Sequence, residues 1–327
     1  MISKKWLQAA AVAGAVPFIL TACGGGGGED GGDGSAEGSE LSGQVGLDGS
    51  STVAPLSEVA AELFMEENNG VQVSVATSGT GGGFERFCNG ETDMNNASRE
   101  IKDDEAANCE ANDIAYEGVQ VANDALAIVV NPDNPIDCLT VDQATQIWDE
   151  GSTVTSWGDV DDLDAGDLAG EDITLYGPGS SSGTFDYFTE AINGEEGQIR
   201  NDYTDIGEDD QAAIVGVEGD VNAMAYIPYS YFTEAGDAVK PLLIDGGDGE
   251  CVEPTLENVQ NGSYAPLGRG LFVYASDVAL ERPEAVEFMS FYVENSEAIT
   301  ETAGFVPMTE EQMAASHEQI ESLTAAN

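Results

Sequence analysis

Residues 43–64 read GQVGLDGSSTVAPLSEVAAELF, and the order of elements that this stretch predicts indicates the fold class. Val45 and Leu47 alternate with small or polar residues, as in a short strand that is half buried. The polar turn DGSST follows. Pro55 then suits the first turn of a helix, and apolar residues recur after it at helical spacing. The stretch predicts a strand, a loop rich in hydroxyl groups and glycine, and a helix.

The same order occurs at two other places in the chain. Alternating valines over 71–75 precede SGTGGG at 78–83, and a helical pattern follows. Apolar residues at 173–175 precede SSSGT at 180–184, again before a helical pattern. Short apolar strands that alternate with amphipathic helices predict an α/β fold.

Two further apolar segments predict strands that cross between two lobes. They are ALAIVV at 125–130 and LFVYA at 271–275. We therefore expect lobe I to hold residues 43–127 and 270–327, and lobe II to hold residues 128–269.

The first residues predict export. Residues 1–23 contain two lysines, then an apolar run too short to span a membrane comfortably, and end in LTAC. The LTAC ending resembles a lipobox, in which the cysteine, here Cys23, is lipidated. Residues 24–42 are rich in glycine and acidic residues and predict a flexible tether. We expect a signal peptide over 1–23 and a lipoprotein anchored to the cell membrane on its extracytoplasmic side, in the periplasm or at the cell surface.

The other four cysteines predict disulfide bonds, because they form an even set in an exported chain. Cys88, Cys109, Cys138 and Cys251 allow three pairings. We favour the pairing of Cys88 with Cys109 and of Cys138 with Cys251, since each bond would then lie within one lobe. No two cysteines have the close spacing of a zinc site, and the single histidine, His317, lies near the end. We expect neither a metal nor a cofactor.

The charge of the chain is strongly acidic. Asp and Glu number 62 against 9 Lys and Arg, which gives a net charge of -53. Such a charge opposes nucleic acid and anionic membrane surfaces as partners. The acidic residues are spread along the chain, which favours a solvated surface suited to high salt.

The three loop-to-helix junctions predict an anion site. A helix start leaves backbone N–H groups unpaired and carries a partial positive charge, and hydroxyl side chains add donors. One such loop is usually an ordinary N-cap, but three with repeated hydroxyl and glycine residues favour a cleft for a tetrahedral oxyanion. Ser98 and Arg99 form a fourth element, because a guanidinium group can hold two oxyanion oxygens. A surface salt bridge is the equal alternative for Arg99.

Four motifs carry a resemblance to a known family. DGSST at 48–52, SGTGGGF at 78–84, NASR at 96–99 and SGTF at 182–185 occur in the order seen in the phosphate-binding proteins of ABC transporters. The chain resembles this family over nearly its whole mature length. The resemblance implies a type II periplasmic-binding-protein fold, with inorganic phosphate bound between two α/β lobes and delivered to the permease subunits of an ABC importer.

The resemblance also implies which residues contact the ligand. By matching motif positions they are Ser51, Thr52, Ser78, Ser98, Arg99, Ser182, Gly183 and Thr184.

Two positions depart from the pattern of many relatives. Arg99 stands where those relatives have an aspartate that accepts the proton of hydrogen phosphate, whereas other members, which this chain resembles more, have the arginine. The relatives with the aspartate carry an arginine shortly before the SGT loop, where this chain has glycine and proline at 177–179. Arg99 would supply that charge from the other lobe, and Asp93 is a candidate proton acceptor.

Other functions compete with phosphate transport as interpretations of the sequence. Binding of another oxyanion, such as sulfate, molybdate or tungstate, would use the same helix starts. A serine hydrolase would need a base beside its nucleophile, and His317 is far from the serine loops in sequence. Acidic pairs for glycoside hydrolysis lie in no recognisable setting. A surface adhesion or scavenging protein would lack a transporter. We expect a binding protein and not an enzyme.

Overall fold

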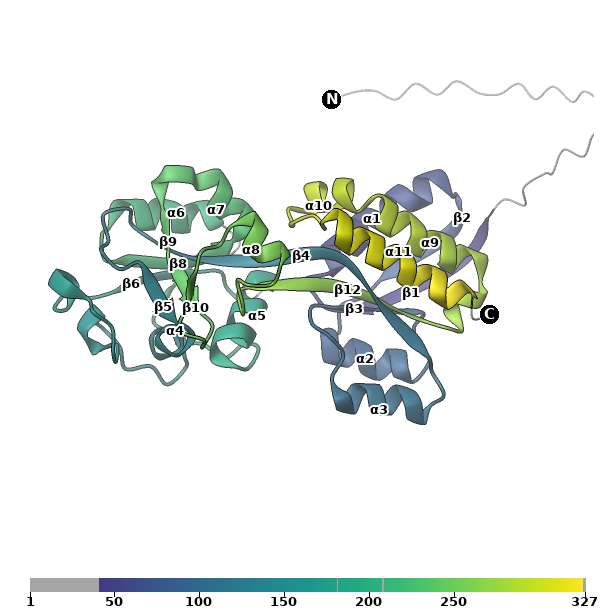
Figure 1. Cartoon of the computed structure of the whole chain (residues 1–327), viewed down its shortest axis with the longest axis horizontal. Helices are drawn as coiled ribbons and strands as arrows, with labels where there is room; N and C mark the ends of the chain where they lie inside the picture. Colours follow the sequence, from purple (N-terminus) through teal and green to yellow (C-terminus); the bar gives the residue numbers. More distant parts are fainter. Residues whose placement is uncertain (1–40, 181, 208, 326–327) are drawn as a thin grey trace, which may run out of the picture. The chain divides into compact units, whose positions relative to one another are not determined.

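The structure is a computed structural model that describes residues 41–325, except Ser181 and Glu208 (Figure 1). The predicted signal peptide, Cys23 and the tether as far as residue 40 lie outside the described residues. Within the described part of the chain, no helix is both long enough and apolar enough to cross a membrane.

One mixed sheet runs through the described chain. Its strands follow the order β2-β1-β3-β12-β4-β8-β6-β7, and β9 pairs with β4 beside this path. The bounds are β1 Ser42–Gly49, β2 Gly70–Val75, β3 Met94–Ala97, β4 Tyr116–Val130, β6 Thr174–Gly177, β7 Thr204–Asp205, β8 Ala223–Pro228, β9 Lys240–Pro241 and β12 Gly268–Ser276. A smaller sheet has the order β11-β10-β5, with β5 Cys138–Thr140, β10 Leu243–Asp245 and β11 Cys251–Val252.

The helices follow the strands along the chain. Their bounds are α1 Ala54–Glu67, α2 Thr80–Cys88, α3 Asp103–Ala111, α4 Val141–Trp148, α5 Gly183–Phe188, α6 Asp210–Gly219, α7 Tyr229–Ala235, α8 Leu256–Gln260, α9 Pro283–Glu294, α10 Ser296–Ala303 and α11 Glu310–Ala325. A π-helical turn, Thr189–Asn193, continues α5. The predicted α/β class is confirmed, and so is the order strand, loop, helix at β1–α1, β2–α2 and β6–α5.

The first strands pair in parallel, so their carboxyl ends lie at one edge of the sheet. In β1, Leu47 lies opposite Val75 of β2 and Met94 of β3. The loops that follow these three strands therefore come together. Most of the predicted anion-site residues in the first half of the chain lie in these loops.

Four hydrophobic clusters lie in the described part of the chain, and the two largest occupy different regions of it. The first combines β1 and α1 with the helices after β12, and includes Leu56, Phe64 and Phe288. The second surrounds the later half of β4, with Trp148 and Tyr226 fully buried. Strands β4 and β12 pair antiparallel from Ser276 opposite Tyr116 to Gly268 opposite Ala125 and run through both regions (Figure 1). These cores support our proposal that lobe I holds residues 43–127 and 270–327 and lobe II holds 128–269.

Two disulfides are present, in the favoured pairing. Cys88 at the end of α2 bonds to Cys109 in α3, and Cys138 in β5 bonds to Cys251 in β11. Each bond therefore joins elements that also pack or pair with each other.

The melting temperature should rise as salt is added. The acidic side chains, which give the chain its net charge of -53, repel one another in the folded state. Molar salt shortens the range of this repulsion to about 3 Å. Thermal unfolding followed by circular dichroism in increasing NaCl tests this expectation, with sucrose of matched osmolality as the uncharged control. A melting temperature that stays level or falls with NaCl contradicts it.

Candidate functional site

Asp48 fixes the first two loops to each other. It lies near the end of β1, its side chain is 1% exposed, and its carboxylate forms an ion pair with Arg86 of α2. The same carboxylate accepts hydrogen bonds from the N–H of Gly49 at 2.8 Å and the N–H of Ser78 at 2.9 Å. Because Ser78 precedes α2 and Arg86 lies in it, Asp48 fixes the start of α2 to the end of β1.

Glycine allows α2 to approach β1. A Cβ atom on Gly83 would lie 2.0 Å from Oδ1 of Asn95 and 2.5 Å from the Cα of Gly49. Gly49 itself has φ of +129° and faces the carbonyl oxygen of Asn96. At these two positions the absence of a side chain lets backbone segments pack against each other.

A small pocket lies where the loops meet. It is lined by Ser50, Ser51 and Thr52 before α1, Gly79 and Thr80 at the start of α2, Ser98 after β3, and Asp186, Tyr187, Glu190, Glu196 and Arg269. Its volume of about 10 Å³ is close to the space for one water molecule. Side chains therefore fill most of the space, and a larger oxyanion would require them to move.

The hydroxyl groups of this pocket contact one another and groups from distant parts of the chain. Oγ1 of Thr80 lies 3.0 Å from Oγ of Ser98. The hydroxyl of Ser51 donates to the Asp186 carboxylate at 3.1 Å, across 135 positions of sequence. Oγ1 of Thr52 accepts from Arg269 at 3.2 Å. The structure thus brings together the predicted residues Ser51, Thr52 and Ser98.

Arg269 is the one arginine of this pocket lining, and it is among the lining residues that the site prediction missed. Its guanidinium carbon lies 3.3 Å from the centre of the Tyr187 ring, and Nη2 lies 3.4 Å from Oδ2 of Asp124. The two ion-paired residues face each other across β12 and β4. Burial raises the pKa of Asp124, and the charge of Arg269 opposes that rise. One feature of the sequence could have identified Arg269, namely the rarity of basic residues, of which the chain has 9.

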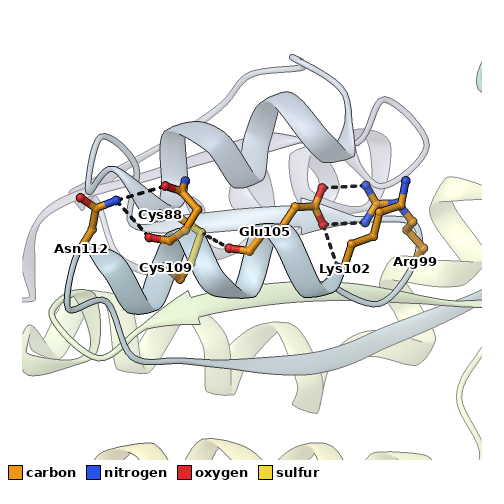
Figure 2. Close-up of a disulfide and its surroundings, with 7 residues drawn as sticks. Cys88, Arg99, Lys102, Glu105, Cys109 and Asn112 are labelled. Atoms are coloured by element: carbon orange, nitrogen blue, oxygen red, sulfur yellow. Dashed lines mark hydrogen bonds and ion pairs between the residues drawn. A yellow bond between two sulfur atoms is a disulfide. The ribbon is translucent and has the colours of Figure 1, made fainter.

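Arg99 forms an ion pair, which is one of the two roles that the sequence allowed for it. Nη1 and Nη2 each donate to one oxygen of Glu105 at 2.8 Å (Figure 2). This interaction with Glu105 raises the pKa of Arg99. Glu105 also accepts the backbone N–H of Lys102 at 2.9 Å, at the start of α3. The disulfide from Cys88 to Cys109 ties this helix to α2.

Arg99 also lines a larger cavity beside the small pocket. The cavity has a volume of about 350 Å³, and Ser98, Glu190 and Arg269 line it too. Contact of Arg99 with a ligand stays a prediction.

Of the other predicted contacts, Gly183 and Thr184 line a cavity, whereas Ser78 and Ser182 are not among the described residues that line the cavities of this site. Ser78 is exposed, and its N–H is the one bound to Asp48. The Ser182 hydroxyl caps α5 by accepting the N–H of Thr184 at 3.2 Å. Gly183 packs against Thr52, because a Cβ placed there would lie 3.5 Å from the Thr52 Cα. Gly183 and Thr184 line a cavity of about 480 Å³ together with Ser51 and Thr52.

Asp93 does not line this pocket, so the structure does not support its suggested role as proton acceptor. It precedes β3 whereas Ser98 follows it, and the two lie at opposite ends of the strand. Asp93 pairs with Arg282 at 2.5 Å and accepts the N–H of Gly46 at 2.8 Å.

The carboxylates that do line the pocket are Asp186, Glu190 and Glu196. Burial raises the pKa of Asp186 and that of Glu196. Among the described residues, no group of three or more His, Cys, Asp or Glu side chains could hold a metal ion.

Comparisons with known proteins identify the family of the chain. The PBP superfamily domain matches residues 34–296. Protein SphX of Synechococcus elongatus is 40% identical over 266 residues, covering 81% of this chain and 77% of its own. The phosphate-binding protein PstS of Staphylococcus saprophyticus is 36% identical over 307 residues, covering 93% and 91%.

A solved structure gives the same result. The crystal structure of a "possible phosphate binding protein" from Planctomyces limnophilus superposes with a TM-score of 0.81 at 37% identity, covering 86% of this chain and 99% of that chain. The chain therefore belongs to the PBP superfamily and, within it, to the family of the PstS phosphate-binding proteins.

Proposed function

We propose that this protein binds inorganic phosphate outside the cytoplasm and delivers it to the permease subunits of an ABC importer. One observation carries the proposal: hydroxyl groups after β1, at the start of α2 and after β3 meet the guanidinium of Arg269 in one pocket. Hydroxyl and backbone donors beside a fixed positive charge suit a tetrahedral oxyanion. Relatives that bear the name phosphate-binding protein support phosphate as that oxyanion.

We assign the ligand contacts to both halves of the chain. The proposed set is Ser51, Thr52, Ser78, Ser98, Arg99, Ser182, Gly183 and Thr184, with Arg269 added from the structure. Hydrogen bonds to a charged acceptor are stronger than those between neutral groups, and together they offset the dehydration of the anion.

The location of the protein follows from the first residues of the sequence. We propose that the segment over 1–23 directs export and that a lipid on Cys23 holds the protein at the extracytoplasmic face of the membrane. Its partners there are phosphate and the permease subunits. The net charge of -53 disfavours nucleic acid as a partner.

We propose a binding role without catalysis. His317, the one histidine of the sequence, belongs to α11, whereas the pocket is lined by the loops before α1 and α2 and by residues near α5 and β12. The serine hydroxyls of the pocket contact Asp186 and Thr80. The alternative function is binding of another tetrahedral oxyanion, namely sulfate, molybdate or tungstate.

Calorimetric titration of the purified protein with phosphate, sulfate and arsenate tests the function. Phosphate should bind much more tightly than sulfate. Ser98→Ala and Thr52→Ala should each weaken phosphate binding by roughly 10- to 100-fold, because a hydrogen bond to a charged group contributes about 1.5–3 kcal/mol. Ser74→Ala, which changes an exposed serine on β2, is the matched control and should leave binding unchanged.

The other outcomes separate the alternatives. Equal or preferred binding of sulfate would assign the protein to import of another oxyanion. If none of the anions binds, the three helix starts are ordinary N-caps with no ligand-binding role.

A further inference from the structure

Glu190 lies between the two arginines of the site. It belongs to the π-helical turn that continues α5. Its Oε1 is 3.9 Å from Nε of Arg99, and its Oε2 is 3.7 Å from Nη1 of Arg269. Each carboxylate oxygen therefore faces a different guanidinium group, and one of these groups comes from the loop after β3 while the other comes from β12.

The carboxylate also lies within the proposed anion site. Glu190 and Arg269 line the small pocket together with Ser51, Thr52 and Ser98. They line the adjacent cavity of about 350 Å³ together with Ser98 and Arg99. A negatively charged side chain thus stands among the donors that an oxyanion would use.

Of the three carboxylates paired with these arginines, Glu190 is the most easily displaced. Glu105 holds Arg99 by two hydrogen bonds of 2.8 Å, and its side chain is 15% exposed. Asp124 lies opposite Arg269 on the neighbouring strand and is 13% exposed. Glu190 makes longer contacts and is 38% exposed, so water can solvate it when it moves. Both arginines keep a partner if Glu190 leaves.

We propose that Glu190 sets the affinity of the site by competing with the bound anion for Arg99 and Arg269. This inference rests on the proposed function. A carboxylate and an oxyanion both present negatively charged oxygens to the same guanidinium groups, so binding of one excludes or weakens the other. Asp186 and Glu196 also line the pocket, but Asp186 accepts from Ser51 and neither makes an ion pair with an arginine in the described chain.

Glu190→Gln tests the competition, because glutamine keeps the size of the side chain and removes its charge. Calorimetric titration with inorganic phosphate should show a Kd lower by about tenfold, which corresponds to about 1.4 kcal/mol. Sulfate should gain by a similar factor, since competition for guanidinium groups does not depend on a proton of the ligand. Glu190→Ala should change the affinity in the same direction.

Glu195→Gln is the matched control. It removes the same charge from an exposed position five residues along, outside the pocket lining, and should change the Kd by less than about twofold, as expected for a screened surface charge.

The outcomes distinguish this inference from the function on which it rests. If the wild type binds phosphate and Glu190→Gln binds it equally or more weakly, the competition is refuted and the function stands. Weaker phosphate with tighter sulfate would show that Glu190 accepts the proton of the ligand instead. If the wild type binds neither anion, the proposed function fails and the inference fails with it.

Discussion

Replacing Asp48 with alanine should lower the free energy of unfolding by about 2–4 kcal/mol, because three donors lose their acceptor at a buried position. The N–H groups of Gly49 and Ser78 would be left without the carboxylate, and Arg86 would lose its ion pair. Since the same carboxylate fixes the start of α2 to the end of β1, from which the loop of Ser51 and Thr52 continues, phosphate binding should also weaken strongly.

Urea unfolding followed by circular dichroism measures this loss, and phosphate titration of the folded variant measures the second effect. Asp48→Asn retains one acceptor and should lie between the wild type and alanine. Glu62→Ala removes an exposed acidic side chain from α1 and serves as control. A loss below about 0.5 kcal/mol for Asp48→Ala, the range of ordinary surface substitutions, would show that Asp48 does not fix the two loops.

Removing the disulfide between Cys138 and Cys251 should lower the free energy of unfolding by about 2–4 kcal/mol. The two cysteines are 113 residues apart, so the bond closes a long loop in the unfolded chain. Cys251 is exposed and Cys138 half buried, and replacing both with serine therefore tests the crosslink more than the packing.

Urea unfolding of the Cys138→Ser, Cys251→Ser double variant measures the effect. The wild type and the variant should be compared with and without a thiol reductant. The reductant should destabilise the wild type more, because the variant has only the bond from Cys88 to Cys109 left to lose. Equal stability of the oxidised wild type and the variant would refute the prediction.

The local pattern of the sequence was sufficient to predict the elements of the site. Alternating apolar residues in β1 and helical spacing in α1 are properties of neighbouring residues, so they can be read without tertiary contacts. The hydroxyl and glycine residues before α1 and α2 likewise indicated that these loops belong to the site. Ser51, Thr52 and Ser98 line the pocket as a result.

The contacts that depend on distant residues could not be predicted in the same way. Arg269 became part of the site through Asp124 on the paired strand and Tyr187 in α5, 145 and 82 positions away by residue number. Asp93 is close to Ser98 in sequence but lies at the other end of a strand, because an extended chain separates residues rapidly in space. Arg99 was ambiguous because the sequence does not specify which of many acidic residues would reach it.

The two disulfides have a consequence for the covalent connectivity of the folded chain. On the proposed lobe boundaries, Cys88–Cys109 lies within lobe I and Cys138–Cys251 within lobe II. Neither bond therefore adds a covalent path from one lobe to the other, and the peptide backbone supplies the connections at β4 and β12. The disulfides can therefore stabilise each lobe without limiting how far the two lobes separate. A reductant should lower the stability of each lobe and leave the range of their relative motion unchanged.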